Sequence, residues 1–146
     1  MATKSEDLVG IAARLRLAIT RTARRLRQQA GTDLSPSQSS ALATIERRGP
    51  LTPSELAAVE RVQRPTATRI VARLEDAGLV TRAGDPSDGR VSLVSVSAEG
   101  RALLRRLRTR KDAYLAQRLR DLDPADAEAL ERAAEVLERL LEDERG

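Results

Sequence analysis

Residues 61–90 read RVQRPTATRIVARLEDAGLVTRAGDPSDGR, and the rest of the chain is organised around this stretch. In its first half, apolar residues recur at i, i+3, i+4 and i+7, the spacing that places side chains on one face of a helix. These residues are Ala67, Ile70, Val71 and Leu74. The pattern predicts a helix that begins near Arg64 or Pro65, ends at Gly78 and packs this face against a core.

The opposite face of the predicted helix carries small, hydroxyl and guanidinium side chains and no acid. Its residues are Pro65, Thr66, Thr68, Arg69, Ala72 and Arg73, with Arg64 at the helix start as a further candidate. Short side chains allow close approach to DNA, hydroxyls contact phosphates, and Arg matches the paired acceptors on a guanine edge. We interpret this face as one that reads a major groove. The alternative for Arg69 and Arg73 is solvated surface, or pairing with the two acids that follow them.

Two helices with recognisable start signals precede this one. Ser35-Pro36-Ser37-Gln38 and Thr52-Pro53-Ser54-Glu55 each place a hydroxyl at the N-cap, Pro at the first helical position and Gln or Glu at the third, which is the capping-box arrangement. They predict helices over about 36–48 and 53–60, with a break near 60–63. A short helix, a tight turn and a longer helix with a polar face are typical of a helix-turn-helix.

A hairpin is predicted directly after these helices. Residues 79–82 and 91–96 are short β-prone runs, and residues 83–90 between them are dense in turn formers, including an Asp-Gly pair that favours hairpins. We interpret the segment as a β-hairpin wing. Arg90 near its tip would enter a narrow minor groove, where negative potential is concentrated; the alternative for Arg90 is exposure to solvent.

The acids of the wing are expected to support its shape. Asp85 and Asp88 would repel phosphate, so direct contact with DNA does not suit them. An Asx-type turn, or a carboxylate that holds an Arg side chain in position, accounts for acids here. We therefore expect Asp85, Asp88 and Gly89 to support the wing.

Long amphipathic helices are predicted at both ends of the chain. Residues 7–29 keep helical spacing of apolar side chains over roughly six turns, and further helices are expected from Ser97 to about Leu122 and over about 124–143. A small domain cannot bury the whole face of so long a first helix, so we expect part of it to meet a second copy. Candidate dimerisation residues are Ile11, Leu15, Leu115, Leu119, Leu130, Leu137, Leu140 and Leu141.

Charge is segregated in the C-terminal part of the chain. Residues 101–120 hold eight basic residues against Asp112 alone, and residues 121–146 hold ten acids against three Arg. We expect ion pairs between helices at a largely apolar dimer interface, with burial dominating because exposed pairs contribute at most about 1 kcal/mol each. The alternative is a coincidence of charge on solvated faces.

The composition argues against an enzyme and against a metal protein. The 146 residues include no His and no Cys, so the commonest general base, a thiol nucleophile and the usual zinc ligands are missing. We expect no catalytic residue, no metal site and no cofactor. No apolar run approaches the roughly 20 residues of a membrane span, and the N-terminus lacks a signal-peptide core, which predicts a cytoplasmic protein without a membrane partner.

In their combined order, these motifs resemble the MarR family of bacterial transcription regulators over nearly the whole chain. The residues that carry the resemblance are LTPSELA (51–57), PTATRIVARLEDAGLV (65–80), DPSDGR (85–90) and SAEG (97–100). The resemblance implies a mainly α fold with a small β-hairpin wing. It places a winged helix-turn-helix domain over 35–97, an N-terminal dimerisation helix over 1–34 and C-terminal dimerisation helices over 98–146.

The resemblance also implies a function. It predicts a homodimeric, sequence-specific transcription regulator that binds double-stranded DNA at a pseudo-palindromic operator, as a repressor that a small-molecule effector releases. By analogy, Pro65, Thr66, Thr68, Arg69 and Arg73 contact the major groove, Arg90 contacts the minor groove, and Asp88 matches the family's acid that supports the wing arginine. Members that sense oxidants use Cys, so that branch is excluded, and the effector itself stays unknown.

A different class of function stays open beside this one. The winged domain could bind protein instead of DNA, which would make the chain a non-catalytic helical interaction protein. The acid-free helix face argues against that reading. Salt dependence discriminates between the two, because DNA binding weakens steeply with salt through counterion release.

Overall fold

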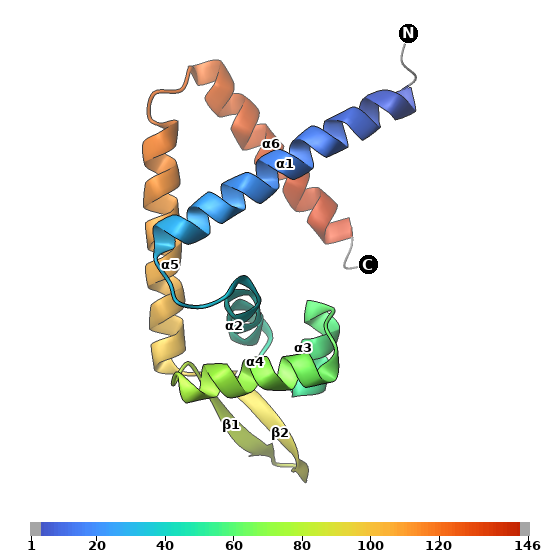
Figure 1. The fold of residues 1–146 in the computed structure, drawn as a ribbon, viewed down its shortest axis with the longest axis vertical. Coiled ribbons are helices and arrows are strands. Elements are labelled where there is room, and N and C mark those ends of the chain that lie inside the picture. The colour runs from blue at the N-terminus through green and yellow to red at the C-terminus, as the bar shows by residue number, and fades with distance from the viewer. Residues whose placement is uncertain (1–3, 144–146) are drawn as a thin grey trace. The chain divides into compact units, whose positions relative to one another are not determined.

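The computed structural model describes residues 4–143, which form six α-helices and one two-stranded antiparallel sheet (Figure 1). In chain order the elements are α1 (Lys4–Ala30), α2 (Pro36–Arg48), α3 (Pro53–Glu60), α4 (Arg64–Asp76), β1 (Val80–Asp85), β2 (Asp88–Val96), α5 (Ala98–Leu119) and α6 (Pro124–Asp143). The predicted fold class, mainly α with a β-hairpin wing, is confirmed. None of the described helices is long and apolar enough to cross a bilayer.

The chain divides into two compact units, Met1–Lys111 and Asp112–Gly146. The first unit contains α1 to α4, the hairpin and most of α5. The second contains the end of α5 and all of α6. The helix-turn-helix and the wing therefore lie within one unit.

The helix starts carry the caps that their sequences indicate. At α2, the Ser35 hydroxyl accepts from the Gln38 N–H at 3.1 Å while the Gln38 side chain accepts from the Ser35 N–H at 3.1 Å, so the capping box is complete. At α3, the Thr52 hydroxyl accepts from the Glu55 N–H at 3.1 Å. The Glu55 carboxylate accepts from the Thr52 hydroxyl at 3.1 Å, whereas in a complete capping box it would accept from the Thr52 backbone N–H.

The core of the first unit lies between α2, α3, α4 and the hairpin. Its most deeply buried large side chains are Leu42, Ile45, Leu56, Val71, Leu74 and Val94. The predicted apolar stripe of α4, Ala67, Ile70, Val71 and Leu74, is buried throughout. Burial of such side chains contributes on the order of 1.5–3 kcal/mol each, so packing determines which face of α4 remains outside.

The hairpin is longer than the sequence suggested, and its turn is shorter. The β-prone runs predicted strands at 79–82 and 91–96, whereas pairing continues along both strands and leaves only Pro86 and Ser87 between them. The small residues near the turn still form backbone pairs, as Ala83 does with Leu93. Pro86 has no N–H and a restricted φ, so pairing stops there.

A single β-bridge joins the hairpin to the segment before α3. Leu51 N–H donates to the Val94 carbonyl at 3.1 Å, and Val94 N–H donates to the Leu51 carbonyl at 2.8 Å. We predicted strands only in the wing, and this pair is an addition that the sequence did not indicate. One bridged residue leaves no alternating pattern to detect. The bridge attaches the base of the wing to the helix-turn-helix.

Gly100 permits the close approach of α5 to the end of α4. A Cβ at this position would meet the Leu79 carbonyl oxygen and would lie 2.9 Å from Cγ2 of Val96. Ser97 fastens the same junction, because its hydroxyl donates to the Gly78 carbonyl at 2.6 Å and accepts from the Gly100 N–H at 3.0 Å. By helix propensity alone, glycine would destabilise α5 at this position. The close packing against Leu79 nevertheless requires a residue without a Cβ.

We expect Gly100→Ala to lower the free energy of unfolding by about 1–3 kcal/mol, because the added methyl group meets backbone that cannot move aside. Chemical denaturation monitored by circular dichroism measures the change. Gly10→Ala is the matched control in α1, where a Cβ meets nothing within 4 Å. That control should stabilise the protein by about 0.5–1 kcal/mol through helix propensity, and equal behaviour of both variants would contradict the packing argument.

Candidate nucleic-acid interface

The exposed face of α4 is basic and lacks acids. Arg64, Pro65, Thr68, Arg69 and Arg73 are exposed, and Thr66 is half-buried. No acid occurs between residues 61 and 74. Buried packing on one side of α4 therefore leaves its basic side accessible.

The acids that follow Arg69 and Arg73 along the chain pair with neither of them. The alternative for Arg73 was a pair with a neighbouring carboxylate, but Glu75 pairs with Arg82 at 3.3 Å. Arg69 makes one long hydrogen bond, from Nη2 to the Thr66 hydroxyl at 3.5 Å. Among the described residues no ion pair holds either guanidinium, so both keep donors for a partner.

Thr68 uses its hydroxyl proton inside the helix. Its Oγ1 donates to the Arg64 carbonyl at 3.0 Å, one turn back along α4. While this bond is made, the hydroxyl presents acceptor lone pairs and a methyl group to the outside. Thr68 is then suited to accept from a base amino group or to contact a thymine methyl, and not to donate to a phosphate.

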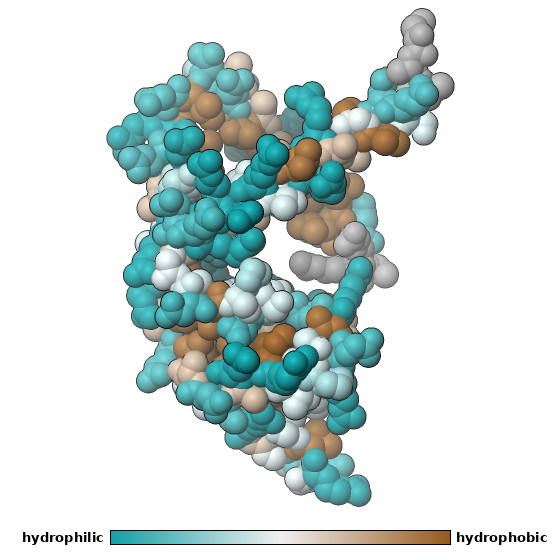
Figure 2. All heavy atoms as spheres, viewed as in Figure 1, coloured by the Kyte–Doolittle hydropathy of each residue, from teal (hydrophilic) through white to brown (hydrophobic). Residues whose placement is uncertain are grey.

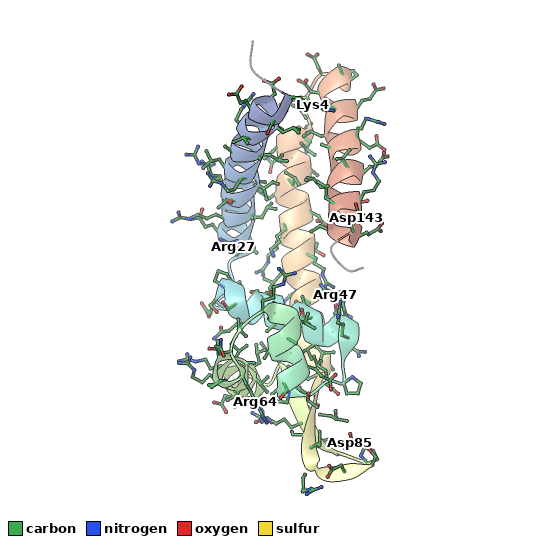
Figure 3. The ribbon with its side chains drawn as sticks, turned by 90° about the vertical axis from the view of Figure 1, so that its right-hand side faces the viewer. Lys4, Arg27, Arg47, Arg64, Asp85 and Asp143 are labelled. Carbon is green, nitrogen blue, oxygen red and sulfur yellow. The ribbon has the colours of Figure 1, made fainter. Side chains whose placement is uncertain are left out.

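At the wing tip, Asp85 organises the turn (Figure 3). Its Oδ1 accepts from the Ser87 hydroxyl at 2.7 Å and from the Ser87 N–H at 2.8 Å, which is an Asx-type turn. The hydroxyl bond, followed by the backbone bond, lowers the pKa of Asp85 from its ordinary value. The carboxylate is therefore ionised at neutral pH and keeps accepting both bonds.

Asp88 holds the root of the Arg90 side chain. Its Oδ1 accepts from the Arg90 N–H at 3.1 Å and from Arg90 Nε at 3.3 Å. The Arg90 side chain is nevertheless 93% exposed. Its two terminal nitrogens make no hydrogen bond within residues 4–143, so the outer edge of the guanidinium stays available. Gly89, between them, is exposed.

Sequence reasoning missed the polar side chains that join α3 to α2. The Glu60 carboxylate at the end of α3 accepts from the Ser40 hydroxyl at 2.8 Å and from the Thr44 hydroxyl at 2.7 Å. The two hydroxyls stand one turn apart on α2. The sequence does show that these two hydroxyls lie four residues apart, beside the buried Ala41 and Ile45 on the helix surface. It does not show which acid accepts their hydrogen bonds.

The candidate dimerisation residues are largely unburied. Ile11 and Leu15 in α1 are exposed, as are Leu119, Leu130, Leu140 and Leu141 in the second unit, while Leu115 and Leu137 are half-buried. Figure 2 shows apolar side chains on the surface along α1. Such apolar area in a protein of this size indicates an interaction surface.

One open depression runs along α5. It has a volume of about 510 Å³ and is lined by Ala102, Arg105, Arg106, Thr109 and Arg110. Arg110 also donates to the carbonyl of Ala30 at the end of α1, at 2.8 Å. The lining has three cations and no acid, so its chemistry suits a small anion.

Comparisons with known proteins support one family. Residues 34–92 match the model of the MarR family. A helix-turn-helix-type transcriptional regulator of Mycobacterium bovis is 40% identical over 134 residues, which make up 91% of this chain and 94% of the relative. A transcriptional regulator of Pseudomonas aeruginosa has a similar crystal structure, with a TM-score of 0.83 and 34% identity over 96% of this chain and 98% of the other.

A further solved structure shares the fold and contains DNA. It is Streptococcus pneumoniae FabT in complex with DNA, with a TM-score of 0.70 and 19% identity over 93% of this chain and 98% of FabT. At that identity the likeness concerns the fold alone. The family model, the relatives and the observed helix-turn-helix with its wing lead to one assignment: the chain belongs to the MarR family and is a DNA-binding transcriptional regulator of the winged helix-turn-helix type.

Proposed function

We propose that this regulator acts as a homodimer that occupies a pseudo-palindromic operator and represses transcription without performing chemistry. The observation that carries the proposal is the exposed, acid-free face of α4, on which no ion pair within the described residues holds Arg69 or Arg73. It needs no catalytic residue, metal or cofactor. In this proposal the protein acts in the cytoplasm, where it has access to DNA.

In this proposal α4 enters the major groove. Pro65 and Thr66 in its N-terminal half are small enough to allow close approach to the DNA. The exposed guanidinium of Arg69 matches the O6 and N7 acceptors of guanine. Arg64 and Arg73 stand at either end of the face, where phosphate strands border a groove. Thr68 adds an acceptor and a methyl group for base edges. FabT, which shares the fold, was solved in complex with DNA, and this supports DNA as the partner of such a fold.

The wing reaches the neighbouring minor groove in the same proposal. Arg90 extends from the hairpin with its outer edge exposed, and Asp88 fixes its Nε side. An arginine held in this way loses little conformational freedom when it enters a narrow groove. Asp85 keeps the turn closed through Ser87, and Gly89 leaves space beside Arg90, so the acids serve the wing without facing phosphate.

A second copy of the chain is required for operator recognition. One recognition helix spans too few base pairs to specify a site, and helix-turn-helix dimers place two such helices about 34–36 Å apart. The exposed apolar residues of α1, and separately those of α6, are available to contact that second copy. Candidate ion pairs between basic and acidic helices would add little beside apolar burial.

A small anionic effector would release the DNA in this scheme. The depression lined by Arg105, Arg106 and Arg110 is the candidate site. Arg110 already contacts the end of α1, so an anion that drew this side chain away would disturb a contact between two helices.

The experiment that tests the proposal is selection of bound sequences from random DNA, repeated in the presence of candidate acidic ligands. A recovered inverted repeat, with half-sites about one helical turn apart, supports a dimeric operator reader. Binding that weakens steeply with salt supports DNA as the partner. Recovery of no sequence, together with affinity that salt leaves unchanged, would favour the protein-binding alternative.

Arg69→Ala should cost about 1–3 kcal/mol of specific binding and relax the preference at one base position in each half-site. The physical reason is loss of a bidentate contact to a base edge. Fluorescence anisotropy with the selected duplex and with single-position variants measures both effects.

The matched control for Arg69→Ala is Arg24→Ala, which removes an exposed arginine from α1. It should leave base preference unchanged. An equal loss on all sequences for Arg69→Ala would reassign this residue to phosphate.

Arg90→Ala should weaken binding by about 1–3 kcal/mol while leaving the unfolding midpoint unchanged, because the side chain is exposed. The loss should be greater on duplexes whose flanks carry A-tracts, whose minor grooves are narrow. Asp88→Ala, which frees the arginine, should give a smaller loss in the same titration. Unchanged affinity of Arg90→Ala on all flanks would rule out the wing contact.

Leu141→Glu should shift the protein from dimer to monomer at micromolar concentration, because a buried unpaired carboxylate opposes apolar contact between copies. Sedimentation velocity in low salt measures the state. Arg139→Glu introduces the same side chain on the same helix and should leave the dimer intact. A wild-type protein that sediments as a monomer would refute the dimer itself.

A further inference from the structure

The turn between α3 and α4 has an unusual backbone. Arg61 adopts φ 55 and ψ 46, in the left-handed region, and among residues 4–143 it is the only residue other than glycine with positive φ. Two other helices in the same chain end at a left-handed residue, and there the residue is glycine, Gly31 after α1 and Gly78 after α4. The turn inside the helix-turn-helix therefore departs from the pattern used elsewhere in this protein.

The hydrogen bonds around Arg61 form a helix ending that favours glycine. Val62 N–H donates to the Ala57 carbonyl at 3.0 Å, and Arg61 N–H donates to the Ala58 carbonyl at 3.3 Å. This pair of bonds defines a Schellman motif with Arg61 at its left-handed position. A side chain there crowds the backbone, because its Cβ approaches the following carbonyl. Local folding preference thus does not explain why arginine occupies the site.

The side chain of Arg61 has no role within the fold. It is exposed, and within the described part of the chain it makes no hydrogen bond or ion pair. The residue before it, Glu60, is held by two hydroxyls of α2, so the backbone that carries Arg61 is anchored. The backbone at Arg61 is therefore held in place while its guanidinium stays unpaired within the described residues, which suits a side chain that contacts a partner molecule.

We propose that Arg61 binds a DNA phosphate at the edge of the major groove, an inference that rests on the proposed function. In a helix-turn-helix the start of the recognition helix contacts base edges while the preceding helix crosses the backbone. Arg61 lies in the turn between these two helices and begins the acid-free run of residues 61–74. A guanidinium there donates charge-assisted bonds to phosphate oxygens and carries no sequence information.

Arg61→Gly separates this role from a structural one. It should raise the midpoint of urea unfolding, because glycine suits the left-handed turn. At the same time it should weaken binding about fivefold to tenfold on the selected operator and on a shuffled duplex alike, and reduce the salt slope by about one for each recognition helix bound. Arg61→Lys keeps the charge and should retain the salt slope.

Anisotropy titrations over a series of salt concentrations, with urea unfolding of the same samples, give the readouts. The inference would be overturned if Arg61→Gly left the affinity and the salt slope unchanged while Arg69→Ala lost base preference. The proposed function would then still stand. A fall in both stability and affinity would overturn the inference too, because the residue would then act through the fold. Wild-type protein with no salt-dependent DNA binding would defeat the proposed function itself.

Discussion

Burial of one face of α4 is the constraint on which the remainder of the first unit depends. Leu74 and Val71 lie fully inside the core with Leu42, Ile45 and Leu56 of the two preceding helices. Rotating α4 about its axis would expose these side chains to water, at on the order of 1.5–3 kcal/mol each. The helix therefore has one stable orientation, and its arginines face outward because the core holds the opposite side.

The second level of organisation consists of polar contacts that join elements distant in sequence. Glu60 joins α3 to α2 through Ser40 and Thr44, and Ser97 joins α5 to the end of α4 through the Gly78 carbonyl. These contacts fasten α3 to α2 and the start of α5 to the end of α4. The second of these junctions is also closely packed, because a Cβ at Gly100 would meet the Leu79 carbonyl oxygen.

Polar contacts also organise the wing, over shorter distances along the chain. A hairpin tip exposed to solvent has few apolar contacts, so hydrogen bonds from Asp85 and Asp88 organise its turn and its arginine. The bridge between Leu51 and Val94 attaches its base to the core. The result is a projection (Figure 1) whose base is packed and whose tip carries a free guanidinium edge.

Much of this architecture follows from local sequence. Apolar residues at helical spacing determine the buried face of α4, and hydroxyl-Pro pairs such as Ser35-Pro36 determine where helices begin, because caps depend on neighbours along the chain. The turn formers after residue 83 locate the hairpin. The family could be read from the order of these motifs.

Only the tertiary structure decided the contacts that join residues far apart. No local pattern indicates that Glu60 meets Ser40, that Gly100 must admit the Leu79 carbonyl, or that the hairpin pairs as far as Asp85. The left-handed conformation of Arg61 is likewise not indicated by the sequence, because the usual signal for this conformation is a glycine. Local preferences act through neighbouring residues, whereas these features depend on which surfaces meet once the core has formed.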